Sequence, residues 1–312
     1  MNNNGSHDPF RIILKGCLTQ CGIQVNVEED RIFDHDRDCR YECPCIEPDE
    51  SIIALFESFK PFIRCLRQKY KGEGVCVDYA DKNFRRAYML AYYPYYISPV
   101  CQTLTVCNYH ELIGPKADLY TCCFGGGPLP ELIGIAKYVN SFLKEMWMID
   151  CTVFDLNKEW QEERELYTLH LAGHYYDGLI NLHDKIIDLW SEELPSPEEV
   201  ANSDLVLFQN CFNDCPPQKY DVLKKNIATI WEKMLVNSTM IIIDLAYGSV
   251  VNLMREIEAM INNLRGEIVK PVTFNDTPLE ICTLLNGRLF DGSDGLIPKY
   301  HCNYWSLVMG KR

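Results

Sequence analysis

The sequence has little positive charge for its length of 312 residues: 30 Lys and Arg face 44 Asp and Glu, for a net charge of −14. Because affinity for phosphate comes mainly from Lys and Arg, this deficit argues against bulk binding of RNA or DNA. The sequence also lacks any apolar run of the roughly 18 residues that a membrane-spanning helix needs. We therefore expect neither nucleic acid nor membrane as a partner.

The first residues, MNNNGSHDPF, lack the basic and then apolar pattern of a secretory signal. The 16 cysteines are an even number, which would suit disulfides, but several lie inside apolar runs, such as Cys122, Cys123 and Cys151. Free cysteine packs there as a small hydrophobic side chain. We expect a cytoplasmic protein with reduced thiols.

Residue composition and the spacing of apolar residues divide the chain into an N-terminal region, residues 1–115, and a second region, residues 116–312. Residues 1–49 are irregular, charged and rich in cysteine. Apolar residues at helical spacing predict helices over 51–70 and 81–93. Ser98 is expected to cap a third helix with Pro99 at its first position. The first region is therefore predicted to be a helical cap.

The second region alternates short apolar runs with amphipathic segments, a rhythm typical of βα units and a mostly parallel sheet. Strands are predicted over 117–124, 146–154, 166–172, 205–209, 240–245, 267–274 and 304–309, and helices over 132–145, 179–190, 219–235 and 250–264. No convincing helix separates the last two runs, so we expect the final strand to be antiparallel.

Three consecutive glycines, Gly125, Gly126 and Gly127, follow the first apolar run directly and precede a helix. Glycine allows a tight turn and the close approach of a ligand to the backbone. The N-terminus of the next helix offers unpaired N–H groups. A plain strand-to-helix turn would leave the same pattern, so the triplet alone does not establish a binding site.

The second apolar run ends in Asp155, 30 residues after Gly125. An acid at the tip of the second strand binds ribose hydroxyls in nucleotide-binding α/β folds, although Asp155 could instead cap the next helix. Polar residues also end the later run 205–209, at Asn210, Asn213 and Asp214. A further acid, Asp244, lies near the end of the run 240–245.

These segments, in this order, resemble the class I S-adenosylmethionine-dependent methyltransferases over about residues 117–312. The resemblance implies a Rossmann-like sheet of seven strands with the last antiparallel, S-adenosylmethionine as cofactor, and a small-molecule or protein acceptor. It implies a cofactor site formed by the glycine loop, the acid after the second strand and the end of the fourth strand, namely Phe124, Gly125, Gly126, Gly127, Pro128, Asp155, Leu156 and Asn210.

Two positions depart from the family's pattern. Cys123 stands where an acid is common, and Leu129 where a third spaced glycine is usual. These departures favour an alternative, a catalytically weak or inactive protein that binds S-adenosylmethionine as a sensor. A nucleotide-dependent oxidoreductase is a weaker third hypothesis, because the prolines at 128 and 130 do not suit a GxGxxG turn.

Methyl transfer needs little from the protein beyond alignment, and a base only where the acceptor must lose a proton early. Asn210, Asp214 and His174 are the catalytic candidates, each also explicable as a capping or solvated residue. Cys211 lacks the preceding proline of the cysteine nucleophiles in RNA cytosine methyltransferases, so we expect a packed thiol.

The aromatic segment before the second region contains Arg85, Tyr88, Tyr92 and Tyr95. Segments in this place often shape the acceptor pocket in the methyltransferase superfamily, and these side chains are our candidates for it. A helix simply packed on the sheet is an equally good interpretation.

A zinc site is a further, weaker hypothesis. Its candidate ligands are His35, Cys39, Cys43 and Cys45, with Cys17 and Cys21 upstream. The spacing lacks a paired CxxC, so a loop of reduced thiols is the favoured interpretation and no bound metal is expected.

Overall fold

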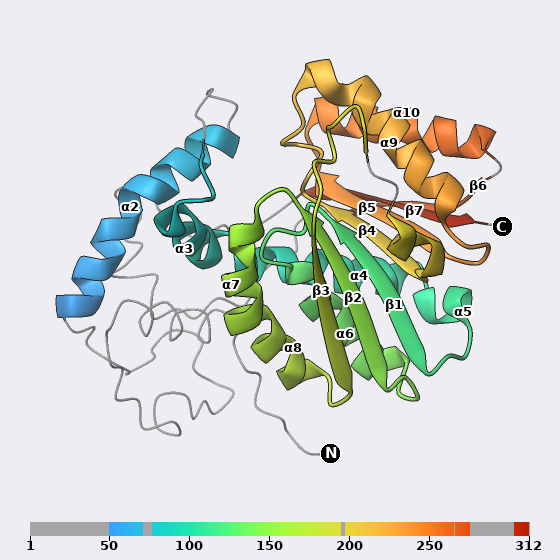
Figure 1. Ribbon diagram of the computed structural model, residues 1–312, viewed down its shortest axis with the longest axis horizontal. Helices are drawn as coiled ribbons and strands as arrows, with labels where there is room; N and C mark the ends of the chain where they lie inside the picture. The colour runs from blue at the N-terminus through green and yellow to red at the C-terminus, as the bar shows by residue number, and fades with distance from the viewer. Residues whose placement is uncertain (1–49, 71–76, 195–196, 265, 275–302, 312) are drawn as a thin grey trace. The chain divides into compact units, whose positions relative to one another are not determined.

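The computed structural model describes residues 50–70, 77–194, 197–264, 266–274 and 303–311 (Figure 1). The described residues up to Tyr95 belong to one compact unit and those from Tyr96 onward to a second. This division lies earlier in the chain than the predicted boundary at 115/116. The expected role of the first unit as a cap on the second stays a prediction.

The first unit contains helices α2 (Glu50–Tyr70) and α3 (Lys82–Ala91). Asp81 caps α3, because its side chain accepts a hydrogen bond of 2.8 Å from the backbone N–H of Asn83. Both helices lie where the apolar spacing predicted them. The described residues of α2 bury one face through Phe59, Ile63 and Leu66.

Helix α4 (Tyr93–Val106) corrects the prediction that Ser98 caps a helix whose first residue is Pro99. It begins six residues before Pro99 and runs through it. Proline removes one backbone donor inside a helix, but buried residues on both sides, Ile97 and Val100 among them, hold this helix in place by packing. A short helix, α5 (Tyr109–Ile113), follows.

The second unit contains a seven-stranded sheet in the order β3-β2-β1-β4-β5-β7-β6. Its strands are β1 (Asp118–Phe124), β2 (Met148–Asp155), β3 (Leu179–Ile186), β4 (Leu205–Gln209), β5 (Thr239–Leu245), β6 (Gly266–Phe274) and β7 (Tyr304–Lys311). Strands β1 to β5 are parallel neighbours, and β7 is antiparallel to both β5 and β6. The mostly parallel sheet with an antiparallel last strand is confirmed.

The helices of this unit cover parts of both faces of the sheet (Figure 1). They are α6 (Pro130–Phe142), α7 (Gln161–Glu163), α8 (Leu169–Tyr175), α9 (Tyr220–Lys233) and α10 (Gly248–Asn263). Helices α9 and α10 pack on the face that carries Phe124, Phe154 and Phe208. Helix α6 covers the other face and lies close to α4, since a Cβ on Gly134 would be 2.8 Å from the carbonyl oxygen of Ile97.

The sequence prediction for the third βα unit was wrong in both elements. Residues 166–172, predicted as a strand, belong to a π-helical turn (Arg164–Thr168) and to α8. Their buried positions recur every four residues, at Tyr167 and Leu171 for example, which is helical spacing. The predicted helix 179–190 is instead β3, an edge strand with mostly exposed or half-buried side chains. An edge strand of that kind shows no clean alternation of apolar and polar residues.

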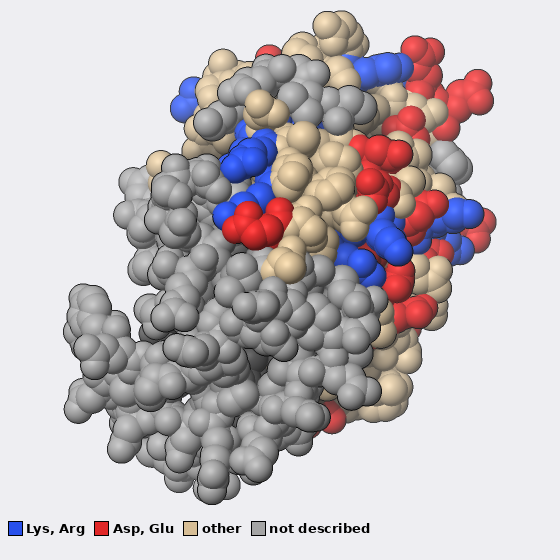
Figure 2. All heavy atoms as spheres, turned by 90° about the vertical axis from the view of Figure 1, so that its left-hand side faces the viewer, with Lys and Arg blue, Asp and Glu red and all other residues tan. Residues whose placement is uncertain are grey.

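Acidic and basic side chains are interspersed on the face of the molecule drawn in Figure 2. Several pair directly, such as Lys185 with Glu199 at 2.9 Å and Lys224 with Glu256 at 2.8 Å. None of the helices that the structure describes combines the length and apolar content that a membrane crossing needs. The cysteines of the described residues are free thiols: Cys65, Cys101, Cys107, Cys122, Cys123, Cys151, Cys211 and Cys215.

Candidate functional site

The loop between β1 and α6 has a regular backbone pattern. Gly125, Gly127 and Leu129 have φ values of +64°, +49° and +63°. Glycine adopts positive φ without strain, whereas a non-glycine residue in this region is strained by about 1–3 kcal/mol. Leu129 therefore keeps the conformation that a third spaced glycine would adopt freely. The residue at 129 thus departs from the family's glycine, but its backbone has the positive φ that glycine favours.

The first two glycines lie too close to their neighbours for any larger residue. A Cβ on Gly125 would be 2.6 Å from the Cβ of Cys211, and one on Gly126 would be 2.7 Å from Cγ2 of Val153. Gly125 thus brings the loop after β1 against the loop after β4. Close packing therefore requires glycine at both 125 and 126, and the positive φ adds a second requirement at 125.

Asp155, at the end of β2, holds the glycine loop. Its Oδ2 accepts a hydrogen bond of 2.8 Å from the N–H of Gly127, and its Oδ1 accepts one of 2.8 Å from the N–H of Asn157. Burial raises the pKa of Asp155, while these two hydrogen bonds and the charge of Arg164 act in the opposite direction. The structure therefore brings together the two segments that the sequence singled out.

Arg164 is a buried cation that the sequence analysis missed. Its side chain is 2% exposed, its Nη1 donates to the carbonyl oxygen of Gly127, and its Nη2 lies 2.5 Å from Oδ1 of Asp184. The guanidinium thus ties the glycine loop to β3. Residues 166–172 were predicted as a strand, and a strand gives no reason to expect position 164 beside the glycine loop. In the structure Arg164 begins the helical segment that leads into α8.

Glu131, in the first turn of α6, is a second residue that the sequence analysis did not single out. The residue is 2% exposed, and its Oε2 has no hydrogen-bond partner in the described part of the chain. Burial raises its pKa well above the ordinary value, and the charge of Asp155 adds to this effect. Its charge also raises the pKa of Cys123, the residue at the position where an acid was expected. The buried acid near β1 is therefore supplied by the helix.

The loop after β4 is organised by Asp244. This carboxylate accepts hydrogen bonds from the N–H groups of Phe212 (2.8 Å) and Asn213 (3.2 Å), from Nδ2 of Asn213 (2.8 Å) and from the N–H of Leu245 (2.7 Å). Burial raises the pKa of Asp244 to about 6, although these hydrogen bonds oppose the change. Asp244 is fully buried, so it supports the loop rather than lining a crevice.

Asn210 begins this loop with a φ of +54°, and its N–H donates to the carbonyl oxygen of Ile243 at 2.9 Å. Its side chain makes no hydrogen bond with the residues that the structure describes, and it is half-buried. The charge of Asp214 raises the pKa of both Asp155 and Cys211, so Asp214 belongs to the same region. Burial raises the pKa of the Cys211 thiol well above its ordinary value, which agrees with a packed thiol.

The other predicted cofactor residues differ in exposure. Phe124 is buried in a stack with Phe154 and Phe208, with ring centroids 4.5 and 4.9 Å away. Pro128 is also buried. Leu156 is 57% exposed directly after Asp155, so its apolar side chain is available to a ligand.

His174 lies at the far edge of the sheet from the glycine loop, which argues against its candidacy. It is near the end of α8, with Nε2 3.2 Å from Nε2 of His170. The hydroxyl of Tyr176, two residues after His174, donates to the carbonyl oxygen of Met146, just before β2 begins. This contact puts the segment at the start of β2, whereas Asp155 and the glycine loop lie at its end. His174 was a candidate because a third strand was predicted to end near it, but the third strand is β3, which begins after it.

The acceptor candidates lie in the first unit. Arg85 is 5% exposed and donates to the carbonyl oxygens of Tyr79 (3.0 Å) and Ala80 (2.9 Å). The rings of Tyr88 and Tyr92 stack at 5.7 Å, and Tyr95 is buried. An acceptor role for these residues stays a prediction. The zinc candidates His35, Cys39, Cys43 and Cys45, with Cys17 and Cys21, lie outside the described residues, and no group of three potential metal ligands occurs within them.

No protein-family model and no curated protein sequence matches this chain. Among solved structures, a putative class I S-adenosylmethionine-dependent methyltransferase from Listeria monocytogenes is similar at a TM-score of 0.47 and 10% identity, over 99% of this chain and 88% of that one. The CMeT domain of the citrinin polyketide synthase has a TM-score of 0.47 and 11% identity, over 98% and 79%.

A methyltransferase from Methanosarcina mazei is also similar, at a TM-score of 0.40 and 11% identity, over 65% of this chain and 96% of that one. The sheet topology is the stronger observation. Its first five strands follow the Rossmann order 3-2-1-4-5, and the antiparallel β7 lies between β5 and β6. With this strand order, the chain has a Rossmann-like fold.

Proposed function

We propose that this protein transfers a methyl group from S-adenosylmethionine to a small molecule or a protein side chain. The observation that carries the proposal is the loop of alternating positive φ at 125, 127 and 129, tied at Gly127 to the carboxylate of Asp155. The loop and the acid joined in this way lie at the carboxyl ends of β1 and β2. Ligands bind outside the carboxyl ends of the strands in open α/β sheets.

The residues at this edge fit the cofactor. Each oxygen of Asp155 accepts one hydrogen bond from the backbone, and a carboxylate has about four acceptor sites. Two sites are therefore left for the hydroxyls of a ribose. The exposed Leu156 offers apolar area beside them for the adenine. The nearby acid Asp214 favours a ligand that carries positive charge, as the sulfonium and ammonium groups of S-adenosylmethionine do.

S-adenosylmethionine supplies an activated methyl group, so the main task of the protein is to align the acceptor. Asn210 is suited to form a wall of the transfer site, because its loop is held rigidly by Asp244 and packed against Gly125. Asn210 and Asp214 remain the candidate helpers, and Arg85, Tyr88, Tyr92 and Tyr95 the candidates for the acceptor pocket.

The first test is calorimetric titration with S-adenosylmethionine, S-adenosylhomocysteine and NAD. We expect binding of the first two, and binding of NAD alone would refute the proposal. Asp155→Ala should weaken the binding of S-adenosylhomocysteine by at least about tenfold, which corresponds to about 1.4 kcal/mol. Asp155→Asn, which keeps one acceptor oxygen, should lose less.

Asp204 is a matched control for this substitution. Its Oδ2 also accepts a backbone hydrogen bond, at 3.1 Å from the N–H of Tyr120, but Asp204 precedes β4 and so lies at the opposite edge of the sheet. Asp204→Ala should lower the melting temperature, as Asp155→Ala does, but leave the dissociation constant unchanged. Equal weakening in both variants would mean that general destabilisation, and not the ribose contact, explains the effect.

The alternative, a sensor that binds S-adenosylmethionine without transferring the methyl group, is favoured by Cys123. Its thiol lies 3.9 Å from that of Cys151 in a buried pair, at a position where the family commonly has an acid. Incubation with S-adenosylmethionine labelled on its methyl group, together with separated small-molecule and protein fractions, distinguishes the two functions. Transfer of label supports the enzyme, and tight binding without transfer supports the sensor.

A further inference from the structure

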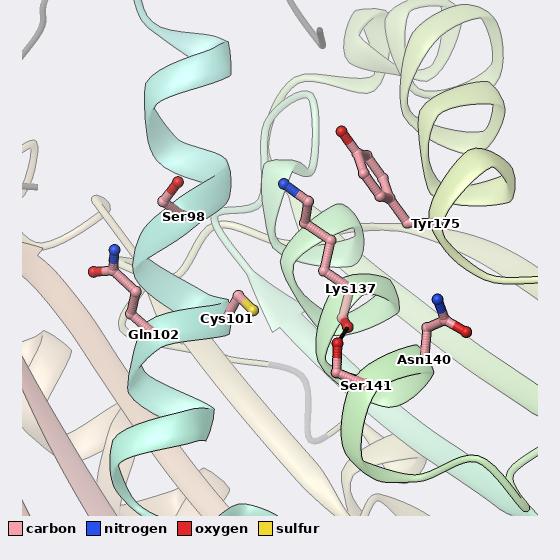
Figure 3. A pocket seen from close by; sticks show the side chains of 7 residues that line it. All are labelled: Ser98, Cys101, Gln102, Lys137, Asn140, Ser141 and Tyr175. Carbon is pink, nitrogen blue, oxygen red and sulfur yellow. Dashed lines mark hydrogen bonds between the residues drawn. The ribbon is translucent and has the colours of Figure 1, made fainter. Parts of the chain in front are cut away.

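A cavity of about 410 Å³ that is open to the surface lies on the side of α6 that faces away from the sheet, between this helix, α4 and the end of α8 (Figure 3). The lining residues are Ser98, Cys101 and Gln102 of α4, Lys137, Asn140 and Ser141 of α6, and Tyr175 of α8. All seven belong to the second unit. This volume lies within the range of small-molecule sites.

The cavity is separate from the glycine loop. Lys137 follows Pro130, the first residue of α6, by seven positions, which is about 10 Å along a helix axis. The helix begins beside the loop and ends toward the opposite edge of the sheet. None of the residues that line the cavity was assigned to the cofactor or to the acceptor.

Lys137 is the only charged residue among the described residues that line the cavity. Figure 3 shows its side chain extending from α6 into the space between α4 and Tyr175. Its Nζ lies 4.4 Å from the centroid of the Tyr175 ring, and no carboxylate of the described residues lies within 4.0 Å of it. Burial lowers the pKa of Lys137, with a smaller opposing effect of Cys101. The ammonium group therefore lacks the anion that usually compensates a partly buried cation.

Other polar groups of the lining are also available. The side chains of Ser98 and Asn140 make no hydrogen bond with the described part of the chain. The hydroxyl of Ser141 donates to the carbonyl oxygen of Lys137 at 2.9 Å, which leaves its oxygen free to accept. Gln102 points to the other side of α4 in Figure 3, and its Oε1 accepts from the hydroxyl of Tyr304. The free donors therefore lie on the same side as the ammonium group.

We propose that this cavity binds a small organic anion, a phosphate ester or a carboxylate, whose charged group contacts the ammonium of Lys137. Hydrogen bonds to a charged partner are roughly twice as strong as neutral ones, and Ser98 and Asn140 add neutral donors. The Tyr175 ring and the Cys101 thiol provide apolar walls for the rest of the molecule. The one charge among the described lining residues is positive, which favours an anion over a cation as the ligand.

Calorimetric titration with three matched probes tests the proposal: glycerol 3-phosphate, glycerate and glycerol. We expect saturable binding of one or both anions and none of glycerol, and the two anions distinguish a phosphate ester from a carboxylate. Lys137→Met, which keeps the length of the stem, should weaken anion binding at least tenfold. Lys144→Met removes an exposed lysine just after α6 and should leave binding unchanged.

Brief labelling with acetic anhydride, read by mass spectrometry, locates the binding in the wild-type protein. The anion that binds should slow acetylation of Lys137 at least fivefold and leave Lys144 unaffected. Absence of saturable binding for both anions, equal binding by Lys137→Met, or equal protection of the two lysines would overturn the proposal. Because S-adenosylhomocysteine should bind Lys137→Met as it binds the wild type, failure here is distinguishable from failure of the proposed function.

Discussion

Replacing glycines in the loop after β1 separates two reasons for their presence. Gly125 and Gly127 both have positive φ, so an alanine at either position is strained by about 1–2 kcal/mol. Their surroundings differ. A Cβ at 127 would be 3.7 Å from the nearest atom, Nε1 of Trp160, which is ordinary contact, whereas one at 125 would be 2.6 Å from the Cβ of Cys211.

Cys211 cannot move away cheaply, because the hydrogen bonds to Asp244 hold its loop. Overpacking of this kind costs about 1–3 kcal/mol. We therefore expect Gly127→Ala to lower the free energy of unfolding by about 1–2 kcal/mol, and Gly125→Ala by about 2–5 kcal/mol. Urea unfolding followed by circular dichroism measures both, provided that the slope with denaturant is unchanged.

A double-mutant cycle identifies the overlapping atom. Cys211→Gly removes the Cβ that a side chain at 125 would meet. Gly125→Ala should therefore be less destabilising by about 1–3 kcal/mol in that background than in the wild type. Cys211→Ala is the control, because it removes the sulfur and keeps the Cβ. Equal losses for Gly125→Ala and Gly127→Ala, or no coupling with Cys211→Gly, would refute the reasoning.

Three other predictions concern buried charges. Burial raises the pKa of Glu131 in the folded state, so its contribution to stability is present below the ordinary pKa and is lost as pH rises through the folded pKa. The melting temperature should therefore fall as pH rises through this range, and Glu131→Gln should reduce that fall. An unchanged dependence of melting temperature on pH in the variant would contradict the prediction. Arg164→Met should cost about 2–4 kcal/mol in urea unfolding, because it leaves Asp184 and the carbonyl of Gly127 without their partner; Asp184 is 30% exposed, which keeps the loss below that of a fully buried pair. The carboxyl ¹³C resonance of Asp244 should titrate near pH 6, and a midpoint below 4 would show that its four hydrogen bonds outweigh burial.

The parts of the fold that were predictable have local signals. The runs that form β1, β2, β4 and β5 are mostly apolar because both faces of a central parallel strand are largely buried. The helices α6, α9 and α10 carry apolar residues at helical spacing. The turn residues of the glycine loop and the acid at 155 are also local. Because the glycine loop follows β1 and the acid follows β2, their order along the chain was enough to predict that the loop and the acid would lie at the same edge of the sheet.

The candidate site was less predictable, since several of its contacts join residues far apart in the sequence. Arg164 reaches Gly127 only because the segment after β2 is helical. Leu129 adopts positive φ, which is uncommon for its residue type. The sequence showed Asp244 only as an acid near the end of an apolar run, yet it is buried beneath the loop that it organises. Each outcome depends on packing rather than on local preference.

By itself, the sequence determined the class of the fold, the central strands, the glycine turn and the position of the acid at 155, because these follow from local patterns of burial and turn formation. Only the tertiary structure decided that β3 is a strand, since an edge strand obtains its conformation by pairing with β2. It likewise decided where Glu131, Arg164 and Lys137 are desolvated, since burial of a charge depends on which helices pack around it and leaves no periodic trace in the chain.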